Sequence, residues 1–120
     1  MKEKYINKYI IKDFSSKNLF HLGFKRKDES LYTFIFPVLK YNNISSLNCI
    51  FTVDSTDGIV LVDVYDLNGN LYRPFYDDEY GNFSDILNII NKNISKQMKK
   101  FSISKLKQTK ERKPNKKWIW

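Results

Sequence analysis

The chain has 120 residues, 42% of them hydrophobic, which suffices for one domain with its own core and not for two. A single cysteine excludes an internal disulfide, and the longest apolar run, FIFPVL, is far shorter than the about 20 residues of a membrane-spanning helix. No secretory signal is visible in the first residues, so we expect a cytoplasmic protein. The formal net charge is +8, which favours an acidic partner.

The aromatic content favours a core built on a β-sheet. Alanine is absent, and nine Phe and eight Tyr supply much of the apolar volume. Large planar side chains suit a pleated surface better than a tight helical bundle. We therefore expect an α+β fold of two layers: an N-terminal helix, a four- or five-stranded antiparallel meander sheet, and a C-terminal basic amphipathic helix with a tail.

The first segment is predicted to be the N-terminal helix. Residues 2–14, KEKYINKYIIKDF, place apolar side chains at helical spacing with lysines between them. The stretch DFSSKN then breaks the pattern.

Residues 19–76 are predicted to form the sheet. The apolar segments LFHLGFKR and LYTFIFPVLKY flank the turn KDES, and SLNCIFTVD and GIVLVDVYDL flank STDG. The segment 31–41 is apolar on both faces, which predicts cover on both sides, and Pro37 requires a bulge or a missing hydrogen bond. Asn68 and Gly69 predict a two-residue turn, both at positive φ, before a further strand in LYRPFY.

The segment 82–101 is predicted to be the basic amphipathic helix. Asn82 is the expected N-cap, and Asp85 lies near the positive end of the helix dipole. The expected apolar stripe consists of Phe83, Ile86, Leu87, Ile90, Ile94, Met98 and Phe101. We expect the helix to continue toward Lys110 and to stop before Pro114.

The charge is segregated along the chain. Residues 1–53 hold nine Lys or Arg against four Asp or Glu, residues 54–85 hold one against eight, and residues 86–120 hold eleven against one. A codon bias toward lysine would scatter these residues evenly, so composition does not explain the pattern. We expect a single domain over residues 1–104 and a basic arm over residues 105–120, which includes two tryptophans.

The basic segment predicts a surface that tracks a phosphate backbone, with the tryptophans as stacking faces for unpaired bases. We therefore expect non-enzymatic binding of nucleic acid, RNA favoured, or of a ribonucleoprotein. The candidate binding residues are Lys92, Lys96, Lys99, Lys100, Lys105, Lys107, Lys110, Arg112, Lys113, Lys116, Lys117, Trp118 and Trp120.

Two other interpretations remain open. Lys, Ile, Asn, Phe and Tyr make up half of the chain, all with A/T-rich codons, which indicates an AT-rich bacterial genome or one of its phages. The chain would then be a phage or mobile-element inhibitor that binds and blocks a host protein, such as a CRISPR-type defence nuclease. Alternatively, the basic segments only pair with the acidic central strands or stay solvated.

Catalytic and metal-binding patterns are weak, so we expect no enzyme, no cofactor and no metal. Residues 66–77 resemble a calcium loop, but its turn glycine is replaced by Leu71 and its bidentate glutamate by Asp77. Four aspartates in the central strands lack the neighbouring lysine often found in metal-dependent nucleases. His21 lies between apolar residues, where a hydrogen-bonded structural imidazole is expected, and Cys49 alternates with core positions, which predicts a buried thiol.

Overall fold

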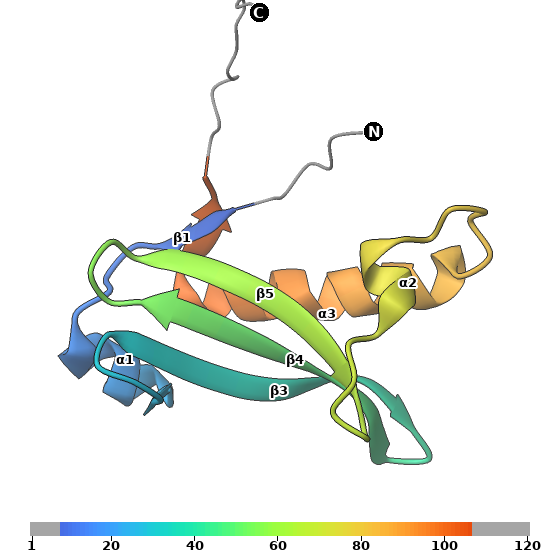
Figure 1. Cartoon of the computed structure of the whole chain (residues 1–120), viewed down its shortest axis with the longest axis horizontal. Helices are drawn as coiled ribbons and strands as arrows, with labels where there is room; N and C mark the ends of the chain where they lie inside the picture. Colours follow the sequence, from blue (N-terminus) through green and yellow to red (C-terminus); the bar gives the residue numbers. More distant parts are fainter. Residues whose placement is uncertain (1–7, 107–120) are drawn as a thin grey trace, which may run out of the picture.

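The computed structural model describes residues 8–106, which form an α+β domain with one antiparallel sheet (Figure 1). The sheet has six strands in the order β2-β3-β4-β5-β1-β6. The predicted fold class is confirmed, and the predicted strand number is too low. The elements are β1 (Tyr9–Ile11), α1 (Ser16–Leu22), β2 (Lys25–Arg26), β3 (Leu31–Tyr41), β4 (Ile44–Asp54), β5 (Ile59–Asp66), α2 (Arg73–Tyr76), α3 (Ser84–Phe101) and β6 (Ile103–Lys105).

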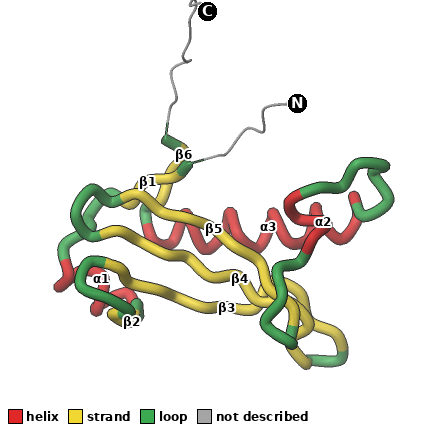
Figure 2. Tube along the Cα trace, in the orientation of Figure 1, coloured by secondary structure: helices red, strands yellow, loops and turns green. Residues whose placement is uncertain are grey.

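The predicted meander is present in β2 to β5, and its three long strands β3, β4 and β5 lie side by side (Figure 2). In β4, Leu47, Cys49, Phe51 and Val53 alternate as buried residues with more exposed ones. The alternation with a period of two therefore predicted correctly which residues of these strands are buried. As predicted, Cys49 is fully buried.

The predicted bulge at Pro37 is also present. The pairing of β3 with β4 shifts between Pro37 and Leu39, which leaves Val38 as an extra residue. At this bulge the side-chain amide of Asn93 in α3 donates a hydrogen bond of 2.8 Å to the Val38 carbonyl. This bond ties the middle of the helix to the irregular part of the sheet.

The prediction of an N-terminal helix is wrong for the residues that the structure describes. Tyr9–Ile11 is strand β1, which pairs with both β5 and β6. A short apolar run of three residues fits either period, and pairing with strands distant in sequence decides between them. The expected strand LFHLGFKR is instead helix α1 followed by the two-residue strand β2. Ser15 caps the start of α1 by accepting the Asn18 N–H, and Gly23 ends it at φ 103°.

The prediction for residues 66–76 is correct in placing a turn at Asn68-Gly69 and wrong for its two-residue type and for the strand after it. Gly69 has φ 85°, but Asn68 does not take the expected positive φ. The Asp66 N–H donates to the Asn70 carbonyl, after which only Leu71 bridges to Tyr65. Residues 73–76 then form the single helical turn α2, with Pro74 in its first turn, where proline is well tolerated.

Helix α3 begins one residue later than predicted, with Phe83 as its N-cap, and it ends at Phe101 rather than continuing toward Lys110. Ser102 takes a left-handed conformation at φ 59°, and β6 follows and pairs with β1. Ile90, Ile94, Met98 and Phe101 are buried, as predicted, whereas Phe83 is exposed. The burial of Ile103 beside Ile11 explains why the chain leaves the helix here.

Both α1 and α3 pack on one face of the sheet, and the other face is uncovered over residues 8–106 (Figure 1). The prediction that β3 is covered on both sides is therefore wrong. Ile35 of β3 is 60% exposed, and Leu61 of β5 is 50% exposed. An apolar residue on a strand's second face does not require a second covering layer.

We predict that Gly58→Ala destabilises the domain more than Gly69→Ala does. Both glycines have positive φ, +81° and +85°, so each alanine costs about 1–2 kcal/mol in backbone strain. A Cβ at Gly58 would also lie 2.6 Å from Phe14 Cδ1, whereas a Cβ at Gly69 meets nothing within 4 Å. Overpacking of this kind adds about 1–3 kcal/mol. Urea unfolding of both variants measures the difference, and equal losses would contradict the close approach of Phe14.

Candidate nucleic-acid interface

The solvent-facing side of α3 carries four lysines. Lys92, Lys96, Lys99 and Lys100 are all exposed, opposite the buried stripe that begins at Ile90. Residues three and four apart on a helix are neighbours, so these ammonium groups form one continuous strip. Between Lys92 and Lys100 the helix rises about 12 Å, at 1.5 Å per residue.

The strip is set by the way α3 packs on the sheet. Phe101 and Ile94 anchor the opposite side of the helix in the core, and Asn93 binds the Val38 carbonyl. Rotation of the helix would break these contacts, so the lysines are held toward solvent. Lys99 and Lys100 also lie in the last turn, where positive charge is favourable to the helix dipole. Helix stabilisation alone therefore accounts for part of this charge.

Two of these lysines border a shallow hollow between α3 and β3. Lys96 and Lys100 line it together with Phe36, Pro37, Asn93 and Gln97. The hollow thus combines two ammonium groups, two side-chain amides and an apolar floor. Such a mixture suits a phosphate with part of its sugar or base.

Of the remaining predicted binding residues the structure describes Lys105, which lies outside α3. Lys105, expected to begin the arm, is exposed in β6 and pairs with Tyr9 across the ladder. The other predicted residues lie outside the described part of the chain: Lys107, Lys110, Arg112, Lys113, Lys116, Lys117, Trp118 and Trp120.

Acidic side chains of the central segment accept hydrogen bonds in the turns and at the edge of the sheet. Asp54 accepts hydrogen bonds from the Thr56 hydroxyl and N–H, which lower the pKa of its carboxyl. Asp66 accepts the N–H groups of Asn68 and Asn70. Within residues 8–106, no three His, Cys, Asp or Glu side chains gather as a metal ion would require.

Asp63 has a different neighbour, the hydroxyl of Tyr76, which donates to it at 2.7 Å. The same hydroxyl accepts the Val64 N–H, and the Tyr72 N–H donates to the Val64 carbonyl. The segment 72–76 therefore satisfies the edge of β5 where β1 no longer pairs with it. Burial and the hydrogen bond to Asp63 raise the pKa of Tyr76.

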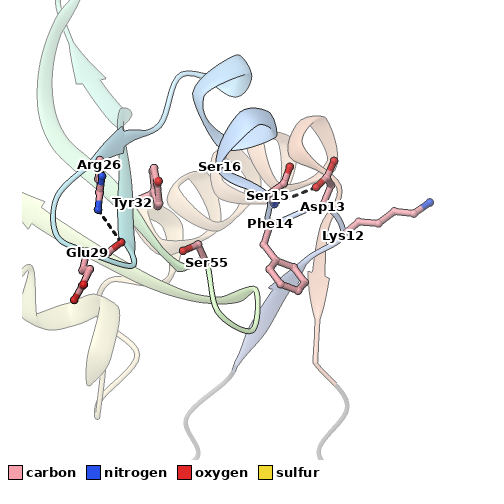
Figure 3. Close-up of a pocket in the computed structure, with 9 residues that line it drawn as sticks. All are labelled: Lys12, Asp13, Phe14, Ser15, Ser16, Arg26, Glu29, Tyr32 and Ser55. Carbon is pink, nitrogen blue, oxygen red and sulfur yellow. Dashed lines mark hydrogen bonds between the residues drawn. The ribbon is translucent and has the colours of Figure 1, made fainter.

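A larger hollow lies between β1, α1 and the β2–β3 turn (Figure 3). Two of its charged side chains form hydrogen bonds within the fold: Arg26 donates to the carbonyls of Asp28 and Glu29, and Asp13 accepts the Ser15 N–H. Lys12 points away from the hollow in Figure 3. The arrangement stabilises loops and contains no histidine or cysteine to act as a base or nucleophile.

His21 and Cys49 lie on different elements, α1 and β4. His21 is exposed on α1, so the expectation of a packed structural imidazole is wrong, because the expected strand is a helix with this side chain on its outer side. Burial, with a smaller contribution from Asp63, raises the pKa of the Cys49 thiol. A buried, protonated thiol is a poor nucleophile.

No protein-family model and no curated protein sequence matches this chain. Among solved structures, the fold is similar to that of a DUF1831 family protein from Lactobacillus plantarum. The two share 16% sequence identity and a TM-score of 0.49, over 82% of this chain and 88% of that chain. A likeness of this degree concerns the fold alone. Within the described residues, no helix is both long and apolar enough to cross a membrane.

Proposed function

We propose that this protein binds nucleic acid, with RNA favoured, or a ribonucleoprotein, and that it does so without catalysis. The strip of four lysines on the solvent side of α3 is the observation that carries the proposal. Ammonium groups that neutralise phosphates release condensed counterions, which supplies affinity without base-specific contacts.

The dimensions of the strip support contact with one strand. The strip is about 12 Å long from Lys92 to Lys100, which permits contact with consecutive phosphates of one strand. The hollow beside Lys96 and Lys100 adds the amides of Asn93 and Gln97 as hydrogen-bonding groups. Polar groups that contact phosphate and sugar position a ligand more than they select its sequence.

The basic arm extends the proposed contact. Six Lys or Arg residues follow Leu106, together with Trp118 and Trp120. Aromatic rings stack on unpaired bases, which favours single-stranded RNA over a closed duplex. The α3 strip would then hold the backbone while the tryptophans contact bases.

A second candidate function is that of an inhibitor that binds and blocks a host protein, such as a defence nuclease of the CRISPR type. The loop between α2 and α3 favours it, because Tyr80 is 80% exposed beside Asp77, Asp78 and Glu79. Tyrosine is enriched among the residues that dominate protein interfaces. The negative charge of this loop would repel phosphate, so the loop fits a protein partner better than nucleic acid.

Charge reversal tests the strip. We expect Lys92→Glu, Lys96→Glu, Lys100→Glu to weaken binding to single-stranded RNA and to reduce the log–log salt slope by about 2, at roughly 0.7 per lost phosphate contact. The matched control reverses Lys17, Lys25 and Lys40, which are also exposed and lie outside α3. Fluorescence anisotropy at several salt concentrations measures both, with circular dichroism to confirm folding. Equal effects of the two triple variants would show that only net charge matters.

Truncation tests the arm. The deletion begins after Leu106, because an earlier end at Phe101 would remove β6 and the buried Ile103. If four of the six deleted basic residues contact phosphates, the salt slope on a duplex falls by about 3–4. A full-length Trp118→Ala, Trp120→Ala variant separates charge from stacking, since it should keep the slope and lose affinity for single strands. An unchanged slope after truncation would exclude phosphate contacts by the arm.

The inhibitor alternative predicts a different dependence. Tyr80→Ala should weaken capture of the host target at least tenfold, while Tyr41→Ala, 74% exposed at the β3–β4 turn, should not. Capture should also persist at high salt, because buried aromatic contacts are not screened as phosphate contacts are. Pull-down from host lysate at low and high salt, followed by titration of the recovered protein, makes the comparison. Loss of capture at high salt in every variant would count against this alternative.

A further inference from the structure

The uncovered face of the sheet carries an apolar patch that spans four strands. Strand pairing places Ile35 of β3 opposite Ile50 of β4, and Ile10 of β1 opposite Ile59 of β5. Leu61 lies between these two pairs, opposite Thr52. The residues next to them along the strands, such as Ile11 and Val60, point to the other face and are fully buried in the core.

Strand pairing places the apolar side chains of this patch next to one another on one face of the sheet. Ile35 is 60% exposed and Leu61 is 50% exposed, although both lie within long, regularly paired strands. Apolar surface removed from water contributes about 25 cal/mol per Å², and contiguous apolar patches on monomers commonly mark contact sites. The patch therefore favours an apolar occupant.

An apolar occupant is available in the same chain, in Trp118, Ile119 and Trp120. The chain between β6 and these residues is long enough for them to reach the patch. The described chain leaves β6 at Leu106, at the edge of the sheet next to β1. Residues 107–117 reach about 35 Å when extended, at roughly 3.3 Å per residue. The far side of the patch on β3 is four strands from β6, or about 19 Å at a strand spacing of about 4.8 Å.

Charge selects the same face of the domain. The α3 side carries the lysine strip, which repels an arm rich in Lys and Arg. The open face carries Asp63 of β5 beside the patch, opposite Ile50 across the ladder, and Lys25 of β2 opposite Thr33, so it lacks the run of lysines found on α3. A second copy of the domain would instead bring this acidic strand against itself, which disfavours dimerisation through the same face.

We propose that Trp118, Ile119 and Trp120 dock on the open sheet face of their own chain, on the patch around Ile35 and Leu61, with the basic residues before them facing the acidic β5. This docking covers the exposed apolar side chains in the protein without nucleic acid. It does not depend on the proposed function, although binding of unpaired bases to the same tryptophans would compete with it.

Tryptophan fluorescence tests the docking directly, because the only two tryptophans are Trp118 and Trp120. In the full-length protein without nucleic acid, we expect the emission maximum to lie at a shorter wavelength than in the denatured protein. We also expect acrylamide to quench the emission at least twofold more slowly than in the denatured protein. Leu61→Lys should abolish both effects, and Ile35→Lys provides a second variant on another strand. Ile44→Lys, at a residue that is 65% exposed at the β3–β4 turn and away from the patch, is the matched control.

The outcomes separate the possible occupants. Emission equal to that of the denatured protein, or equal quenching in Leu61→Lys and Ile44→Lys, overturns the proposal. A blue shift that disappears on dilution also overturns it, because it would mean that the tryptophans occupy another copy. A shift that is independent of protein concentration and lost in the patch variants supports it. Because nucleic acid is absent from these measurements, a negative result does not affect the proposed binding by the lysine strip, which the salt dependence tests separately.

Discussion

The packing of Phe101 in the aromatic core is the interaction on which the rest of the structure depends. Its ring lies 4.8 Å from that of Phe34 in an edge-to-face arrangement, 5.5 Å from Phe24 and 6.4 Å from Phe51. Phe34 comes from β3, Phe51 from β4, and Phe24 directly follows Gly23, the C-cap of α1. One side chain at the end of α3 therefore joins both helices to the sheet, with a gain beyond simple area burial.

The position of Phe101 also determines how the chain continues. With this ring in the core, the helix ends, Ser102 turns in a left-handed conformation, and Ile103 enters the core beside Ile11. The pairing of β6 with β1 follows and completes the sheet. The same anchoring prevents α3 from rotating, which holds its lysines on the side away from the sheet.

The two layers consequently differ in charge and in polarity. The helix layer presents ammonium groups to solvent, while the sheet layer presents isoleucine and leucine beside Asp63. In sequence this appears as a basic segment that follows an acidic one. In three dimensions the lysine strip lies on the helix side and Asp63 on the open sheet face, so these charges do not cancel at one surface. An elongated anion and an apolar, basic peptide would thus prefer different faces.

The long elements were determined by local sequence. Each of β3, β4 and β5 has at least eight residues, and α3 has 18, so the periods of two and 3.6 repeat often enough to be distinguished. The bulge at Pro37 follows from its missing N–H, and the end of β5 follows from the turn-forming Asn68-Gly69. The exposed lysines of α3 were predictable for the same reason, because a long apolar stripe defines the opposite side.

Only the tertiary structure decided the short elements and the cover of the sheet. Tyr9–Ile11 and Ile103–Lys105 have three residues each, too few to show a period, and they become strands because each supplies the other's hydrogen-bonding partner. LFHLGF is as apolar as a strand, but Ser15 and Gly23 cap it as a helix that buries Leu19. The second face of β3 is uncovered because α1 and α3 both pack on the aromatic side. Alternation along one strand reports which residues share a face, and the elements available to pack on it decide which face is covered.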